Sequence, residues 1–155
     1  MIVEIRIDDL QGSGIIRLLE EHLADMHATS PAESVHALDV KALQHPSITF
    51  WSAAEGNSVL GCVALKSLSR DHGEIKSMRT SGAARNKGVA TKLLNHLIAD
   101  AKSRGFKQLS LETGTQAFFS AAHGLYAKHG FVDCEPFGDY QPDPNSKFMT
   151  LVLEQ

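Results

Sequence analysis

The sequence contains few cysteines and no long apolar run. Cys62 and Cys134 are the only cysteines in 155 residues, which excludes a disulfide framework and makes a reducing cytoplasm the expected compartment. No apolar stretch approaches the roughly 18 residues that a membrane span requires. The first residues, Met1–Arg6, have a strand pattern and lack the parts of a signal peptide. We therefore expect a cytoplasmic protein with no membrane partner.

An excess of basic charge is also missing. The chain has 15 Lys and Arg against 18 Asp and Glu, a net charge of −3 and a pI near 6.2, whereas a general nucleic-acid binder usually has a basic face. The eight histidines include no His-Glu-x-x-His arrangement and no short cluster with cysteine, the patterns typical of bound zinc. We therefore expect neither a nucleic-acid partner nor a metal.

The composition that is present is that of an ordinary globular protein. With 43% hydrophobic and 21% charged residues, a chain of this length can form one domain, 1–155, with a substantial core. Strands are expected at 2–7, 48–55, 59–68, 74–79, 109–112, 131–133 and 148–153. Helices are expected at 12–26, 39–45, 88–104 and 118–129. This order predicts an α/β (α+β) fold in which helices cover both faces of a mixed sheet.

The stretch from Glu74 to Arg104 is the most informative part of the chain. A strand is followed by the sequence Arg85-Asn86-Lys87-Gly88-Val89-Ala90 and then by a long amphipathic helix. The first backbone N–H groups of a helix have no partner within it, and the helix dipole makes that end positive. The first turn carries cations instead of the usual Asp or Glu, and Gly88 allows a close approach to the backbone. The pattern predicts a phosphate or pyrophosphate site, the alternative being a helix that simply begins with two solvated cations.

Two motifs together make the chain resemble the GCN5-related N-acetyltransferase (GNAT) family, in particular its bacterial single-domain members. The family's acyl-CoA motif is Arg or Gln, two residues, Gly, one residue, then Gly or Ala, which matches Arg85–Ala90. A second element, Leu-Tyr shortly before Gly-Phe, matches Leu125-Tyr126 and Gly130-Phe131. The order of elements matches over essentially the whole chain. The resemblance implies a mixed, mostly antiparallel sheet of about seven strands flanked by about four helices, with acetyl-CoA as co-substrate.

The resemblance also implies where acetyl-CoA binds. The pyrophosphate would lie on the backbone N–H groups of residues 85–91, and the pantetheine arm would pair with the end of strand 74–79 as an extra strand does, between strands that part. Many members carry an Asn seven residues before the tyrosine, where this chain has Phe119, which could pack on the pantetheine or the adenine. The implied cofactor-binding residues are Met78, Arg79, Thr80, Arg85, Asn86, Lys87, Gly88, Val89, Ala90, Thr91, Phe119 and Tyr126.

Acetyl transfer requires a deprotonated amine, a polarised thioester carbonyl and a proton for the departing thiolate. By resemblance, the Met78 N–H polarises the carbonyl and Tyr126 is the acid. The alternative for Tyr126 is a core tyrosine with its hydroxyl at the rim. Glu74 stands where the histone-modifying branch carries its base, Glu112 is the competing base, and a solvated carboxylate is the alternative for Glu74. Neither cysteine has a recognisable activating partner, which favours direct transfer in a ternary complex.

The acceptor is expected to be a primary amine, most simply of a small molecule. Two polar segments are candidates for the walls of its site. They contribute His27, Ser30, Glu33, Ser34 and His36 from the first, and Asp139, Tyr140, Asn145 and Ser146 from the second. Acids in these walls favour a cationic amine. The sequence leaves open a protein-lysine acetyltransferase, a non-catalytic acyl-CoA-binding module, and a homodimer formed through strand and loop edges near the C-terminus.

Overall fold

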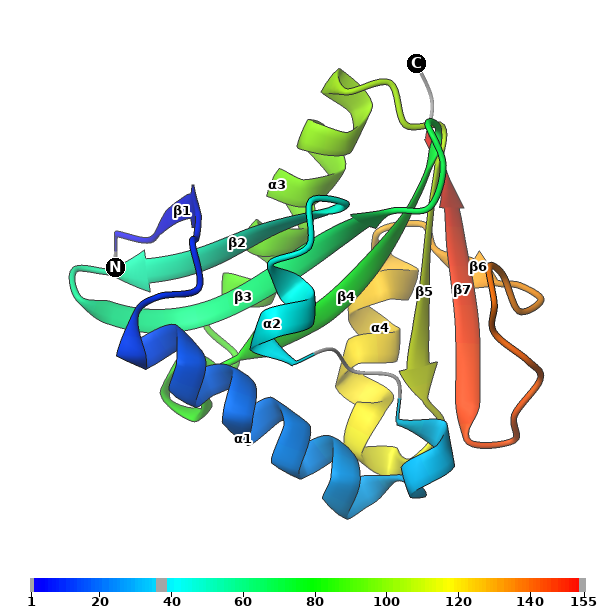
Figure 1. Cartoon of the computed structure of the whole chain (residues 1–155), viewed down its shortest axis with the longest axis horizontal. Helices are drawn as coiled ribbons and strands as arrows, with labels where there is room; N and C mark the ends of the chain where they lie inside the picture. The colour runs from blue at the N-terminus through cyan, green and yellow to red at the C-terminus, as the bar shows by residue number, and fades with distance from the viewer. Residues whose placement is uncertain (1, 36–38, 154–155) are drawn as a thin grey trace.

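The computed structural model describes residues 2–35 and 39–153, which form one seven-stranded sheet with helices on both faces (Figure 1). The strands are β1 (Glu4–Ile7), β2 (Ile48–Glu55), β3 (Ser58–Ser67), β4 (His72–Thr80), β5 (Gln108–Gly114), β6 (Val132–Asp133) and β7 (Ser146–Val152). The α-helices are α1 (Ser13–Thr29), α2 (Val40–Leu43), α3 (Val89–Ser103) and α4 (Ser120–Lys128), and the 3-10 turns are η1 (Ala32–Ser34), η2 (Gly82–Ala84) and η3 (Ala117–Phe119).

The sheet has the strand order β1-β2-β3-β4-β5-β7-β6. Neighbouring strands pair antiparallel everywhere except at β4 and β5, which run parallel. The predicted mixed, mostly antiparallel sheet is therefore confirmed. The predicted helix 118–129 is divided into η3 and α4, and α1 extends three residues beyond the predicted end at Met26.

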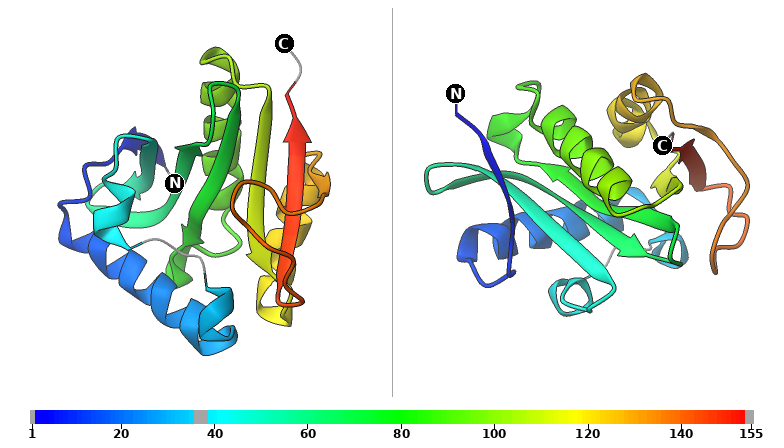
Figure 2. Two further views of the ribbon diagram at one scale, coloured as in Figure 1. Left: turned by 45° about the vertical axis from the view of Figure 1, so that its right-hand side comes forward. Right: turned by 90° about the horizontal axis from the view of Figure 1, so that it is seen from above.

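The helices form two layers on opposite faces of the sheet. The right-hand view of Figure 2, which is seen from above, shows α1 and α2 on one side of the sheet and α3 and α4 on the other. Helix α3 buries an apolar stripe with the helical spacing that the sequence predicts, Val89, Leu93, Leu97 and Ala101. That stripe packs on Trp51, Val63, Leu65 and Ile75 of the sheet, whereas α1 packs on Phe50, Cys62 and Ala64 of the opposite face.

Strands β4 and β5 separate halfway along their length. They pair from His72 and Gln108 as far as Ile75 and Leu111, although β4 continues to Thr80 and β5 to Gly114. Figure 1 shows the two ribbons close together at the top and far apart at the bottom. The predicted parting of these strands is confirmed, and it leaves the last part of β4 with no partner strand on the β5 side among the described residues.

The remaining expectations concern membrane spans, disulfides and a homodimer. None of the helices within 2–35 and 39–153 has the length and apolarity that crossing a bilayer demands. Both cysteines are free thiols, so they form no disulfide with each other. Val132 and Val152 are exposed at the β6–β7 end of the sheet, and the homodimer expected from the C-terminal edges stays a prediction.

Candidate active site

A cleft of about 610 Å³ lies where β4 and β5 part. Its walls come from α1 and the segment after it, the second half of β4, the start of α3, the end of β5, and η3 with α4. Most of the predicted site residues line it together, namely Glu74, Met78, Arg79, Thr80, Arg85, Asn86, Gly88, Val89, Ala90, Thr91, Glu112, Phe119 and Tyr126. Lys87 is exposed and does not line the cleft.

One end of the cleft is the N-terminus of α3. Gly88 caps the helix in the left-handed conformation, with φ +79°, and Asn86 is also left-handed, with φ +63°. The first hydrogen bond of the helix runs from Lys92 N to Gly88 O, 3.1 Å, so the N–H groups of residues 89–91 have no partner within the helix. No acid occupies the first turn. A Cβ at Gly88 would meet nothing within 4 Å, which shows open space above this backbone.

A β-bulge shapes the middle of the cleft. Between the pairs Cys62–Arg79 and Ala64–Lys76, β3 contributes one residue and β4 contributes two, Ser77 and Met78, and Ser77 has φ +55°. Because the bulge adds one residue, Met78 packs with the α3-side core that Ile75 also joins. The backbone of β4 beyond the bulge borders the cleft as an edge that an extended ligand can pair with.

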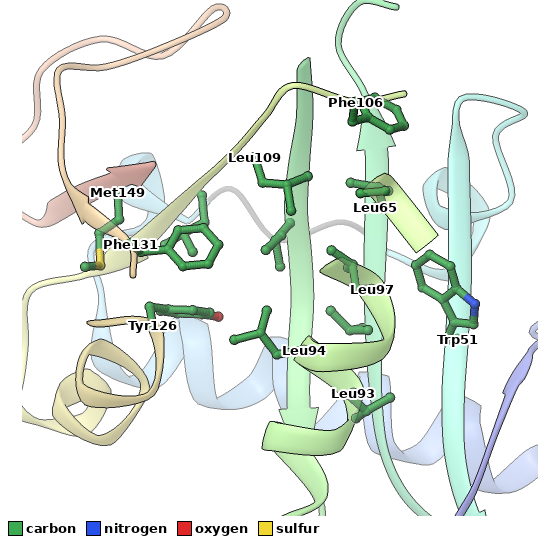
Figure 3. Close-up of a cluster of buried hydrophobic side chains, with 14 of the residues drawn as sticks. Trp51, Leu65, Leu93, Leu94, Leu97, Phe106, Leu109, Tyr126, Phe131 and Met149 are labelled. Atoms are coloured by element: carbon green, nitrogen blue, oxygen red, sulfur yellow. The ribbon is translucent and has the colours of Figure 1, made fainter. Parts of the chain in front are cut away.

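Tyr126 reaches the cleft from α4. It is 5% exposed, and its ring packs edge-on against Phe131 at 5.7 Å between centroids. Figure 3 shows its hydroxyl directed away from α4 and toward Leu94 of α3. Burial raises the pKa of this phenol well above its ordinary value, because the charged phenolate is poorly solvated there. Tyr126 therefore holds its proton throughout the neutral range, as a proton donor must.

Glu74 and Glu112 share the opposite face of the sheet. Ile75 and Leu111 point into the α3-side core, so their chain neighbours point the other way. Glu74 is 3% exposed, and its Oε2 accepts hydrogen bonds from the Tyr140 hydroxyl at 2.5 Å and from Lys76 Nζ at 3.1 Å. Glu112 is half-buried on β5 and lines the same cleft.

The side chain of Arg79 points toward α1. This side chain is 10% exposed, and its guanidinium contacts Asp25 at 2.6 Å and Glu21 at 3.9 Å. Beside it on α1, His22 is 8% exposed and lines the cleft. Burial, reinforced by the positive charge of Arg79, lowers the pKa of His22 to about 4. Any contact of Arg79 with a cofactor would therefore involve its backbone, because its side chain is already ion-paired.

Phe119 lies at the far end of the cleft, where the resemblance led us to expect an Asn. It is buried in η3, and its ring meets Phe118 edge-on at 5.0 Å. A Cβ at Gly114 would overlap this ring, so the ring rests directly on the backbone of β5. This wall offers an apolar surface in place of an amide hydrogen bond.

The predicted acceptor walls are only partly present in the cleft. Ser30 and Ser34 line it, His27 and Glu33 are exposed beside it, and His36 lies outside the described residues. From the second segment, Tyr140 reaches Glu74. Asp139 is exposed, and Asn145 and Ser146 are half-buried outside the cleft.

Sequence reasoning missed His22 and Met26 of α1 and the bulge residue Ser77, all of which line the cleft. The position of His22, three and four residues after the buried Leu19 and Leu18, is the signal that could have identified it.

Comparison with known proteins agrees with this geometry. The model of the "Acetyltransferase (GNAT) family" matches residues 9–131. The chain belongs to the GNAT family. It is 54% identical to "Uncharacterized N-acetyltransferase YsnE" of Bacillus subtilis, over 97% of this chain and 100% of the relative, and 50% identical to "Uncharacterized N-acetyltransferase YedL" of Escherichia coli, over 96% and 94%. The expectation of an acyl-CoA-dependent GNAT acetyltransferase is therefore confirmed.

A solved N-acetyltransferase structure shares the fold. The PaiA N-acetyltransferase from Thermoplasma acidophilum, solved in complex with coenzyme A, superposes with a TM-score of 0.74 over 99% of this chain and 100% of its own, at 17% identity. At this identity the likeness establishes the shared fold. Within the described part of the GNAT chain, no three His, Cys, Asp or Glu side chains gather as metal ligands would.

Proposed function

We propose that this GNAT protein transfers the acetyl group of acetyl-CoA directly to a primary amine of a small acceptor. One observation carries the proposal. The unpaired edge of β4 begins beside Glu74 and runs toward the N-terminus of α3, which has no side-chain cap, and Tyr126 reaches the same cleft from α4. An extended thioester with a diphosphate at one end has the shape and charge of that path.

The residues present fit coenzyme A. The α3 N-terminus offers unpaired N–H groups, no opposing acid, and open space over Gly88, as a diphosphate requires. Arg85 is exposed at this end and adds a positive charge. Met78 and Thr80 lie on the unpaired edge of β4, where backbone groups can pair with the amides of pantetheine. We assign this end and this edge to the cofactor.

Bound acetyl-CoA supplies an activated acyl group and a thiolate leaving group. The chain must then remove a proton from the amine, donate to the developing oxyanion and return a proton to sulfur. We assign the first role to Glu74, whose carboxylate borders the cleft, the second to the Met78 N–H, and the third to Tyr126, whose raised pKa keeps it protonated. Cys62 is fully buried, and burial raises the pKa of its thiol to about 12, which supports direct transfer without an acyl-cysteine.

Acidic side chains favour a cationic acceptor. Lys76 neutralises much of the charge of Glu74, and Glu112 brings a second carboxylate to the same cleft. On the α1 side, Arg79 is paired with Asp25, and burial lowers the pKa of His22 to about 4, so that His22 is neutral near pH 7. An ammonium group entering from the α1 side therefore meets a negative balance of charge.

The test is the release of free thiol from acetyl-CoA in the presence of a panel of amines. Cationic primary amines should stimulate release well above background, with the acetylated amine identified by mass spectrometry. Coenzyme A binding without thiol release would contradict the proposal and indicate a non-catalytic module. Acetyl-lysine on lysate proteins with no activity on small amines would contradict it in favour of a protein-lysine acetyltransferase. Glu74→Gln serves as the inactive reference.

A further inference from the structure

The segment between β6 and β7, residues 134–145, places one side chain against the carboxylate of Glu74, which lines the cleft. The hydroxyl of Tyr140 donates to Oε2 of Glu74 at 2.5 Å, across 66 positions in the sequence. Lys76 Nζ completes a triangle, at 3.1 Å from the same carboxylate oxygen and 3.0 Å from the Tyr140 oxygen. The other carboxylate oxygen, Oε1, accepts no hydrogen bond from the described residues. Oε2 of Glu74 is thus held by two donors, whereas Oε1 is available to a group bound in the cleft.

The ring of Tyr140 is held in place by aromatic neighbours. Phe137 and Phe148 contact it at centroid distances of 5.2 and 5.4 Å, and the ammonium group of Lys76 lies 5.6 Å from its centroid. Tyr140 itself does not line the cleft. A side chain that is packed this firmly and ends on a cleft carboxylate can fix the orientation of that carboxylate without touching a substrate.

The rest of the segment is tied to the body of the protein on both sides. Ser34 Oγ donates to Asp143 Oδ2 at 2.6 Å, which joins the segment to η1. Thr115 N donates to Asn145 O at 3.2 Å, and Gln116 Nε2 donates to Asn145 Oδ1 at 3.2 Å, which joins it to the end of β5. A connection of this length without regular structure usually has a functional reason to be ordered, and these ties lie at Asp143 and Asn145, shortly after Tyr140 in the sequence.

We propose that Tyr140 is a positioning residue for Glu74, which fixes Oε2 of the carboxylate and so aims its Oε1 at the amine. The inference rests on the proposed function, in which Glu74 takes the amine proton. It adds a residue from outside the two family motifs to the reacting end of the site.

The charges around Glu74 set the direction of the expected effect. Lys76 and the Tyr140 hydroxyl favour the ionised carboxylate, because they donate to it. Glu112 opposes it, and burial lowers the pKa of the neighbouring His72. Burial, and then the nearby charge of Glu74, raises the pKa of Tyr140 itself, so the donor keeps its proton. Removing the hydroxyl therefore takes away one of the two donors that favour the charged carboxylate.

The experiment compares wild type with Tyr140→Phe, which keeps the ring and deletes the donor. In kcat/KM against pH, activity falls on the acid side as the base becomes protonated. We expect this acid limb to move to higher pH by about one pH unit in the variant, with a lower kcat and an unchanged KM for acetyl-CoA. Titration of the Glu74 carboxyl by carbon-13 NMR in the unliganded proteins should show the same shift without relying on turnover.

Two further variants make the result specific. Lys76→Met removes the second donor to the same oxygen and should move the acid limb in the same direction. Thr150→Val removes a hydroxyl on β7 that bonds Gln108 and Ser110 and does not touch Glu74, so it should leave the limb in place.

The inference is overturned if Tyr140→Phe leaves both the acid limb of the kcat/KM profile and the carboxyl titration unchanged. This holds even if kcat falls, because a residue with a merely structural role lowers kcat without moving the acid limb. The proposed function fails separately, if wild type transfers no acetyl group or if Glu74→Gln retains full turnover.

Discussion

The ring of Phe119 rests on the backbone of Gly114, so closely that a Cβ at Gly114 would overlap it. Gly114 pairs with Ser146 of β7, so the strand cannot easily move away. Phe119 belongs to η3 and lines the cleft. Because Gly114 has no side chain, the Phe119 ring can lie against β5 instead of projecting further into the cleft.

Gly114→Ala should therefore push the Phe119 ring into the cleft. Overpacking of this kind costs about 1–3 kcal/mol, and we expect the KM for acetyl-CoA to rise roughly tenfold, the change that about 1.4 kcal/mol produces. Steady-state kinetics measure it. The double variant Gly114→Ala with Phe119→Leu should recover part of the loss. Gly124→Ala on α4, where a Cβ meets nothing within 4 Å, is the matched control, and equal KM values for both alanine variants would contradict this account.

Gly88 and Gly82 form a matched pair of positions for testing the proposed diphosphate site at the N-terminus of α3. Both have open space for a Cβ, but only Gly88 has a positive φ, +79°. An L-residue in that conformation costs about 1–2 kcal/mol, so Gly88→Ala should lower the free energy of unfolding by that amount and weaken CoA binding about tenfold as the N–H groups shift. Gly82→Ala should be nearly neutral in both. Urea unfolding and calorimetry with CoA measure the two effects. Equal CoA affinity in the two variants would show that the left-handed conformation of Gly88 does not contribute to CoA binding.

Local sequence patterns were enough to predict most of the fold and to name many of the residues that line the cleft. The helix expected at 88–104 spans Val89–Ser103, because its apolar spacing and terminal glycines are determined within one short segment. The two motifs lie on α3 and α4, and the parting of β4 and β5 brings them to one cleft. Short-range signals suffice where a cleft is built from backbone groups near a helix end.

Contacts between distant segments could not be predicted in the same way. Tyr140 reaches Glu74 from a segment without periodicity, and Ser34 meets Asp143 across 109 positions. Arg79 follows the bulge at Ser77, and its side chain turns to Asp25 of α1. Such partners depend on how loops and bulges pack in three dimensions. The sequence therefore indicated which segments are polar, but not which hydrogen bonds and ion pairs their side chains form.

Tyr126→Phe tests the assigned acid. The ring and its contact with Phe131 remain, so the fold and CoA affinity should be preserved, and turnover should fall roughly 100- to 10,000-fold, the usual scale for acid catalysis. Because burial raises the pKa of Tyr126 above the neutral range, the basic limb of the wild-type pH profile should not arise from this group. Phe131→Leu is the control, since it loosens the same packing and keeps the hydroxyl. Unchanged turnover in Tyr126→Phe would assign the proton to another group.

His22 should make the stability of the fold depend on pH. Its pKa is about 4 in the folded protein, because of burial and then Arg79, against an ordinary 6.5. Between these values the unfolded chain binds more protons, so stability falls as pH falls. The contribution is complete above pH 6.5 and lost as pH approaches 4, on the order of 3 kcal/mol. His22→Gln cannot take up this proton. Urea unfolding from pH 7.5 to 4.5 should therefore show a steeper loss in wild type than in the variant, after the slope common to both is subtracted, and parallel losses would show that His22 is protonated in the fold.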